Sequence, residues 1–137
     1  MFLNLLTERQ KQSFLALATK VVMADGNVVP EESVTLDVRV AEMGGAIKAP
    51  PEEIYGVPNY DIFDTPRARL ICVLELLVIA YSDDEFHVDE RPIIHQLVEV
   101  FGYSPVQMEA FEAWARKQAP LSVEGWDFIV AAEGKGL

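Results

Sequence analysis

The sequence predicts an all-α protein of about six to seven antiparallel helices, forming a single domain over residues 1–137. Three observations support this prediction. Apolar residues recur at helical spacing in several segments, and no stretch alternates apolar and polar residues long enough for a convincing strand. Capping residues and prolines precede these segments, and glycines follow several of them. Finally, a shift of 58 positions aligns two helix–acidic turn–helix units, at about residues 12–44 and 70–102.

The repeat pairs residues of similar character in the two units. Two acidic stretches, Met23–Ser33 and Ala80–Arg91, interrupt the helices at equivalent points. The flanking positions also correspond: Asp25 with Asp83, Glu32 with Glu90, Phe14 with Cys72, Ala18 with Leu76, Val21 with Ile79, Leu36 with Ile94, Val40 with Val98, and Gly44 with Gly102.

Two helices are predicted in the first unit. Thr7 and Gln10 have the spacing of a capping box, and a helix should follow to about Ala24. Pro30 is suited to the first turn of the second helix, which should stop at Gly44. The first helix carries an apolar stripe of Phe14, Leu17, Ala18, Val21 and Val22.

Residues 46–64 are the least regular part of the chain. Pro51 and the two acidic residues after it could open one short helical turn. We expect this linker to lie on the core, because it carries the apolar and aromatic residues Ile54, Tyr55, Tyr60, Ile62 and Phe63.

The second unit should contain the central helix. Thr65 and Pro66 suit an N-cap and a first helical residue, and Leu70–Ala80 is apolar on nearly every face, which is typical of a helix buried on most sides. Cys72 is interpreted as a small core residue. Glu75 is the one charged residue in this segment, and we expect its side chain to point to solvent through an open strip of the helix. The alternative is a buried carboxylate that contributes to the acidic turn.

Three more helices are expected after the second acidic turn. One should run to about Phe101, before Gly102, and the next from the Ser104–Pro105 cap to about Gln118. His95 is interpreted as a residue of the helix surface or boundary.

Pro120 is expected to end that second helix, and Ser122 to cap a last one. We expect Trp114 and Trp126 to be core anchors between these last two helices.

Composition limits the classes of function. The net charge of −11 argues against binding a phosphate backbone or an anionic membrane, and favours cations and basic protein surfaces, including membrane-associated partners. A single cysteine excludes an internal disulfide and favours a reducing cytosol. The longest apolar block, Leu70–Tyr81, is too short to span a bilayer, and no targeting segment is evident. We therefore expect a soluble, cytoplasmic protein.

The acidic turns suggest a cation site. If the two units pack about an approximate twofold axis, Asp25, Glu32, Asp83 and Glu90 come close together. Two carboxylates about 4 Å apart repel by about 4 kcal/mol at an effective dielectric of about 20, and a bound cation reverses that sign. Oxygen ligands suit Ca²⁺, Mg²⁺ or Mn²⁺, and His87 would admit Zn²⁺ if its ring faced inward. The alternative is that these acids only cap helices.

A resemblance adds to this interpretation. The segments FLALATKVVMADGNVVPEE and LELLVIAYSDDEFHVDER, with the pattern A-D-G-x-V-x-x-x-E in the first, resemble the TerB-like family, named for a tellurite-resistance protein. The similarity covers roughly residues 10–130. It implies about seven helices and acidic turns that bind a divalent cation, with Asp25 and Glu32 in one turn and Asp83 and Glu90 in the other. The second turn departs from the pattern, because Asp84 stands where the first has Gly26.

Three functions are compatible with the sequence. The first is a non-enzymatic TerB-like scaffold that binds a divalent cation in a bacterial stress response of the tellurite-resistance type. The second is a metal-independent interaction module whose acidic surface meets a basic partner. The third is a metal-dependent hydrolase. It ranks last because the sequence has no nucleophile elbow, phosphate loop or HExxH motif, so no catalytic residue and no cofactor other than a cation is expected.

Overall fold

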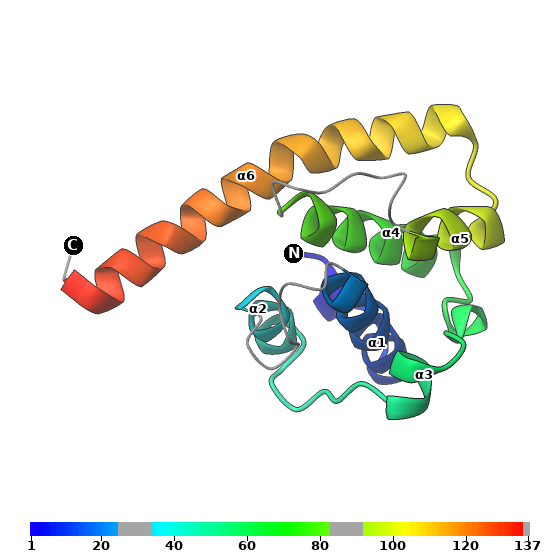
Figure 1. Ribbon diagram of the computed structural model, residues 1–137, viewed down its shortest axis with the longest axis horizontal. Helices are drawn as coiled ribbons and strands as arrows, with labels where there is room; N and C mark the ends of the chain where they lie inside the picture. The colour runs from blue at the N-terminus through cyan, green and yellow to red at the C-terminus, as the bar shows by residue number, and fades with distance from the viewer. Residues whose placement is uncertain (25–33, 83–91, 136–137) are drawn as a thin grey trace.

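The protein is helical throughout the part that the structure describes. The structure, a computed structural model, describes residues 1–24, 34–82 and 92–135 (Figure 1). Within these ranges it contains six α-helices, two short 3-10 turns and no strand. The predicted all-α fold class is therefore confirmed. None of the described helices is both long and apolar enough to cross a membrane.

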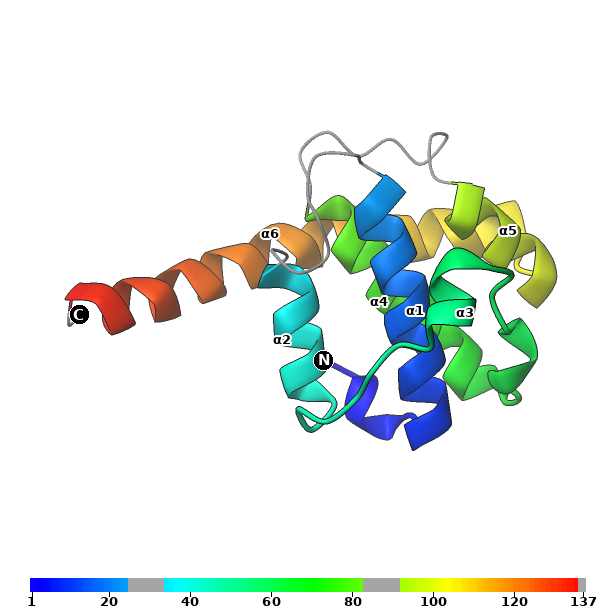
Figure 2. The same ribbon diagram turned by 60° about the horizontal axis from the view of Figure 1, so that its bottom comes forward.

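Helix α4 (Pro66–Tyr81) is the centre of the packing. It contacts α1 (Glu8–Ala24) on one side, and α5 (Pro92–Phe101) and α6 (Pro105–Lys135) on others (Figures 1 and 2). Its buried positions run almost without interruption from Ile71 to Ala80. Cys72 is fully buried, as predicted for a small core residue. A helix that is apolar on all sides needs neighbours on all sides, and α4 has them.

The 58-residue repeat is visible in how the helices begin. The hydroxyl of Thr7 accepts the amide N–H of Gln10 at 3.2 Å, and that of Thr65 accepts the amide N–H of Ala68 at 3.1 Å. Gln10 completes the capping box by accepting the Thr7 amide at 3.0 Å. The two caps lie 58 positions apart, as the core pairs do. Each cap accepts from a backbone amide of the first helical turn that has no partner within the helix.

The repeat also shows in how the second helix of each unit ends. Gly44 follows α2 (Val34–Glu42) with φ +104°, and Gly102 follows α5 with φ +78°. The amide of Gly45 bonds the carbonyl of Val40 at 2.9 Å, and the amide of Tyr103 bonds that of Val98 at 3.2 Å. Both are the long hydrogen bond of a Schellman ending, which needs a left-handed residue that glycine supplies at little cost.

The linker between the units is held on α1 by buried polar contacts. The short helix α3 (Pro51–Tyr55) places Glu53, only 5% exposed, beside α1. Its two oxygens accept from Ser13 and from Arg9, each at 2.8 Å. At the 3-10 turn η3 (Tyr60–Ile62) and just after it, the linker buries the rings of Tyr60 and Phe63, as predicted, whereas Tyr55 is 76% exposed, contrary to the prediction.

Helix α6 differs from the prediction. The sequence suggested a break at Pro120 and a new cap at Ser122, but one helix runs through both to Lys135. Inside that helix, the Ser122 hydroxyl accepts from the Gln118 side chain at 3.1 Å. A proline within a helix removes one hydrogen bond and costs about 3 kcal/mol. The contacts of α6 with α4 hold the residues before Pro120 in place, and the helix continues past it into open space (Figures 1 and 2).

The substitution Pro120→Ala tests this continuity. In an unbroken helix the new amide would donate to the Arg116 carbonyl, so we expect the free energy of unfolding to rise, by up to about 3 kcal/mol. Thermal unfolding followed by circular dichroism measures the change. If the chain broke at this point, losing a loop proline would instead lower stability by about 0.4–1 kcal/mol.

Candidate functional site

Glu75 is the most unusual charged residue in the described core. The sequence favoured an outward-pointing side chain, which is wrong: Glu75 is only 1% exposed, in the middle of α4. Its Oε1 accepts the amide N–H of Phe2 at 2.9 Å and lies 3.2 Å from the amino group of Met1. The buried carboxylate therefore binds the first residues of the chain to the central helix. The alternative interpretation was right about burial, and these contacts give the carboxylate a role in holding the fold.

The second oxygen of Glu75 faces Arg39 on α2. Its Oε2 lies 3.5 Å from Nε of Arg39, a residue only 8% exposed. Neither of these two atoms has a hydrogen-bond partner in the structure. The contact is therefore a buried ion pair whose main contribution is charge neutralisation rather than a hydrogen bond. Buried charges need such compensation because leaving water is costly.

A groove opens beside this ion pair. It has a volume of about 500 Å³, within the range of about 300–1,000 Å³ common for binding pockets. One wall comes from α2 and the chain start, and the other from α6. Its lining residues are Met1, Val38, Arg39, Glu42, Ser82, Leu121, Ser122, Val123, Gly125, Trp126 and Ile129. We call this the α2–α6 groove.

The polar end of the groove is close to neutral. The Met1 amino group donates to Oε2 of Glu42 at 2.6 Å, and Arg39 is opposed by Glu75. The rest of the lining is mainly apolar. Such a surface suits an apolar ligand with few charges of its own.

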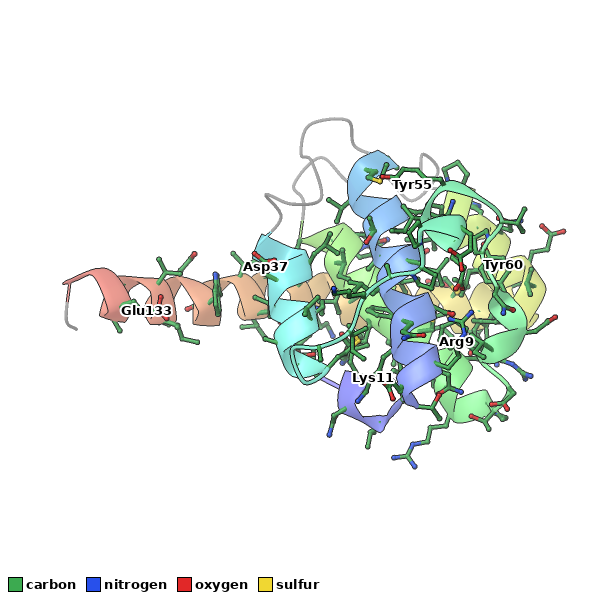
Figure 3. All side chains as sticks on the ribbon, turned by 90° about the horizontal axis from the view of Figure 1, so that it is seen from below. Arg9, Lys11, Asp37, Tyr55, Tyr60 and Glu133 are labelled. Atoms are coloured by element: carbon green, nitrogen blue, oxygen red, sulfur yellow. The ribbon has the colours of Figure 1, made fainter. Side chains whose placement is uncertain are left out.

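The α6 wall of the groove is part of residues 120–135, which we call the α6 extension. Other described helices leave much of the surface of this segment exposed. Figure 3 shows its side chains, Glu133 among them, standing clear of the other helices. Before Pro120, the core side of α6 carries Ala115 and Ala119, both fully buried. Seven positions after Ala119, on the same side of the helix, Trp126 is 37% exposed. The face that packs on the core therefore continues outward without cover from any of residues 1–24, 34–82 and 92–135.

The two tryptophans differ from their predicted role. No pair of terminal helices exists for them to join. Trp114 is half-buried and stacks near Phe2, with ring centroids 6.2 Å apart and planes tilted by 31°. Trp126 lines the groove instead of the core. The predicted role as core anchors is therefore wrong for Trp126, whose side chain is exposed, and Trp114 meets the core through Phe2 rather than through a second terminal helix.

The predicted cation ligands lie outside the described residues. This applies to Asp25, Glu32, Asp83, Glu90 and His87. Across residues 1–24, 34–82 and 92–135 there is no group of three or more His, Cys, Asp or Glu side chains arranged to hold a metal ion. The other histidine, His95, is exposed on α5, as predicted.

Two nucleophilic side chains are buried in structural roles. Cys72 is inaccessible, and burial raises the pKa of its thiol, so the thiolate is disfavoured. Ser13 is 2% exposed, and its hydroxyl donates to Glu53 while accepting from Arg9. The Arg9–Ser13–Glu53 contacts therefore join α1 to α3.

Comparison of this chain with protein-family models, curated proteins and solved structures found no match. The TerB-like resemblance therefore stays a prediction.

Sequence reasoning missed the groove and its ion pair. The available signal was a lone carboxylate in an otherwise apolar helix, together with a lone arginine in the apolar pattern of α2. Two such isolated charges of opposite sign are candidates for a buried pair. Local spacing does not show which distant residues meet.

The ion pair gives a stability prediction. Glu75→Gln keeps an oxygen to accept the Phe2 amide but leaves Arg39 buried without its counter-charge. We expect the free energy of unfolding to fall by about 3–5 kcal/mol, as when one partner of a buried pair is removed. Chemical denaturation measures it, with exposed Glu109→Gln as the control.

The double variant Glu75→Gln/Arg39→Met completes this test. It buries no charge, so it should recover part of the lost stability. If the double variant lost as much as the two single variants together, the two residues would not be coupled.

Proposed function

We propose that this protein is a non-enzymatic, TerB-like interaction module that binds a helical protein segment in the α2–α6 groove. The observation that carries the proposal is the uncovered apolar face of the α6 extension beside that groove. Its exposed apolar side chains are Leu121, Val123, Trp126, Phe128, Ile129 and Val130, between 37% and 60% exposed. Contiguous exposed apolar surface of this kind marks interaction sites.

The shape and charge of the groove support a helix as the ligand. One wall is itself a helix, so the groove runs along a helix axis and suits an apolar stripe with i, i+3, i+4 and i+7 anchors. The exposed acids Asp37 on α2 and Glu133 on α6 allow basic residues at the edge of the partner. The setting in a bacterial stress response comes from the family resemblance alone.

A second function has its own supporting observation. The start of α2 at Val34 and the start of α5 at Pro92 are 58 positions apart, and so are the N-caps of α1 and α4. The two acidic segments are therefore framed by equivalent helices. We propose that their carboxylates, Asp25, Glu32, Asp83 and Glu90, with His87 as a further ligand for Zn²⁺, hold a divalent cation.

Helix binding is tested with a labelled synthetic peptide that has one Leu/Ala face and balanced charges. We expect anisotropy titrations to give a dissociation constant of about 10–100 µM, because a generic helix fills the groove without optimised contacts. Ile129→Glu should weaken binding at least tenfold. Val106→Glu, a matched change at a 77%-exposed valine near the other end of α6, should leave it unchanged. Equal affinity for all three proteins would refute the groove as the site.

Cation binding is tested by thermal unfolding after chelation, followed by single additions of Ca²⁺, Mg²⁺, Mn²⁺ and Zn²⁺. A cation at about 100 times its dissociation constant should add about 2.7 kcal/mol, a shift of several degrees. The shift should disappear in Asp25→Ala and Glu90→Ala and persist in Glu109→Ala. An unchanged melting temperature with every ion would leave these carboxylates as helix caps.

A further inference from the structure

Within the described part of the chain, the α6 extension is an apolar helix that no other segment covers, and it lies beside an apolar groove. Two of the three acidic residues of the α6 extension, Glu124 and Asp127, lie opposite the face of Ser122 at 100° per residue, and the third, Glu133, lies on that face near the end of the segment. Apolar residues occupy both flanks of the groove face, from Phe128 and Leu121 on one edge to Val130 and Val123 on the other. A helix apolar over so much of its circumference is normally covered on more than one side.

We propose that the groove is occupied by the α6 extension of a second copy of this chain, so that two copies form a twofold-symmetric dimer with their α6 extensions crossing antiparallel. This inference rests on the proposed function, because it names the helix that the groove binds. The two halves of the interface, groove and helix, are on the same chain, which is the self-complementarity that a twofold contact requires.

Gly125 supplies an independent argument for where the helices cross. It lies in the middle of the exposed apolar segment and lines the groove, and a Cβ added there would meet nothing within 4 Å. Glycine inside a helix costs about 1 kcal/mol relative to alanine, and no contact within the described chain requires it. A second helix crossing at this point does require it, because only glycine lets the two backbones approach closely.

A crossing at Gly125 also gives a consistent register. Antiparallel helices centred there place Leu121 level with Ile129 of the partner subunit, which pairs two exposed apolar side chains. Asp127 lies about 160° around the helix from Gly125, away from the crossing. The net charge of −11 per chain opposes association, and added salt screens that repulsion.

The available area is sufficient for a modest dimer. Leu121 and Phe128 are each 60% exposed, and the other four apolar side chains are 37–49% exposed. Aromatic side chains bury about 150–250 Å² each and aliphatic ones less, so the exposed parts of the six supply about 500 Å² per copy and about 1,000 Å² in total, the lower limit for a specific interface. We expect a micromolar dissociation constant rather than an obligate dimer.

Sedimentation equilibrium of the full chain tests the proposal. At about 200 µM, well above a micromolar dissociation constant, the wild type should sediment at twice its monomer mass of 15.3 kDa. Association should strengthen with added salt. Ile129→Glu should raise the dissociation constant at least tenfold, and so should Gly125→Leu, although leucine enlarges the apolar face. Val106→Glu should behave as the wild type. An excess of the peptide used above should dissociate the dimer.

Two results would overturn the dimer. One is a wild type that stays monomeric at about 200 µM in high salt. The other is self-association that Ile129→Glu and Gly125→Leu leave intact. If the monomer still binds the helical peptide through Ile129, the proposed function stands and a different chain fills the groove. If it neither associates nor binds the peptide, both proposals fail.

Discussion

The carboxylate of Glu75 is the interaction on which the surrounding structure depends. It is buried in the central helix, where an uncompensated charge would be costly, and it is neutralised from two directions. The amide of Phe2 and the amino group of Met1 come from the chain start, and Arg39 comes from α2. Since Met1 and Arg39 also line the α2–α6 groove, the requirement to neutralise one core charge fixes one wall of the binding surface.

The other organising constraint is the internal repeat. Threonine caps, left-handed glycines and buried apolar pairs recur 58 positions apart, so the two units use the same local chemistry to start, pack and end their helices. Their surroundings differ. The second unit supplies α4, which is covered on all sides, whereas α1 of the first unit contacts the linker helix α3. Helix α6 stands outside the repeat and has no counterpart in the first unit.

Most of the helices could be predicted from sequence because their signals are local. The capping box at Thr7, the Thr65–Pro66 start and the glycine at residue 102 each act within one helical turn. The wrong predictions concern features that depend on contacts between residues far apart in the sequence. Pro120 is a local signal for a break, but α6 continues through it. Glu75 looks solvent-exposed until its partners, 73 positions away at Phe2 and on α2 at Arg39, are known. The groove combines four separate segments, and no local pattern reveals such a combination.

The unbroken course of α6 also has a mechanical consequence. Its first half packs on α4, while the 15 residues after Pro120 project beyond it for about 22 Å. A tilt of about 10° at the missing hydrogen bond of Pro120 would displace the tip by about 4 Å. A force applied near Lys135 would therefore act with leverage on the part of α6 that packs on α4. There Trp114 lies against Phe2, whose amide donates to Glu75.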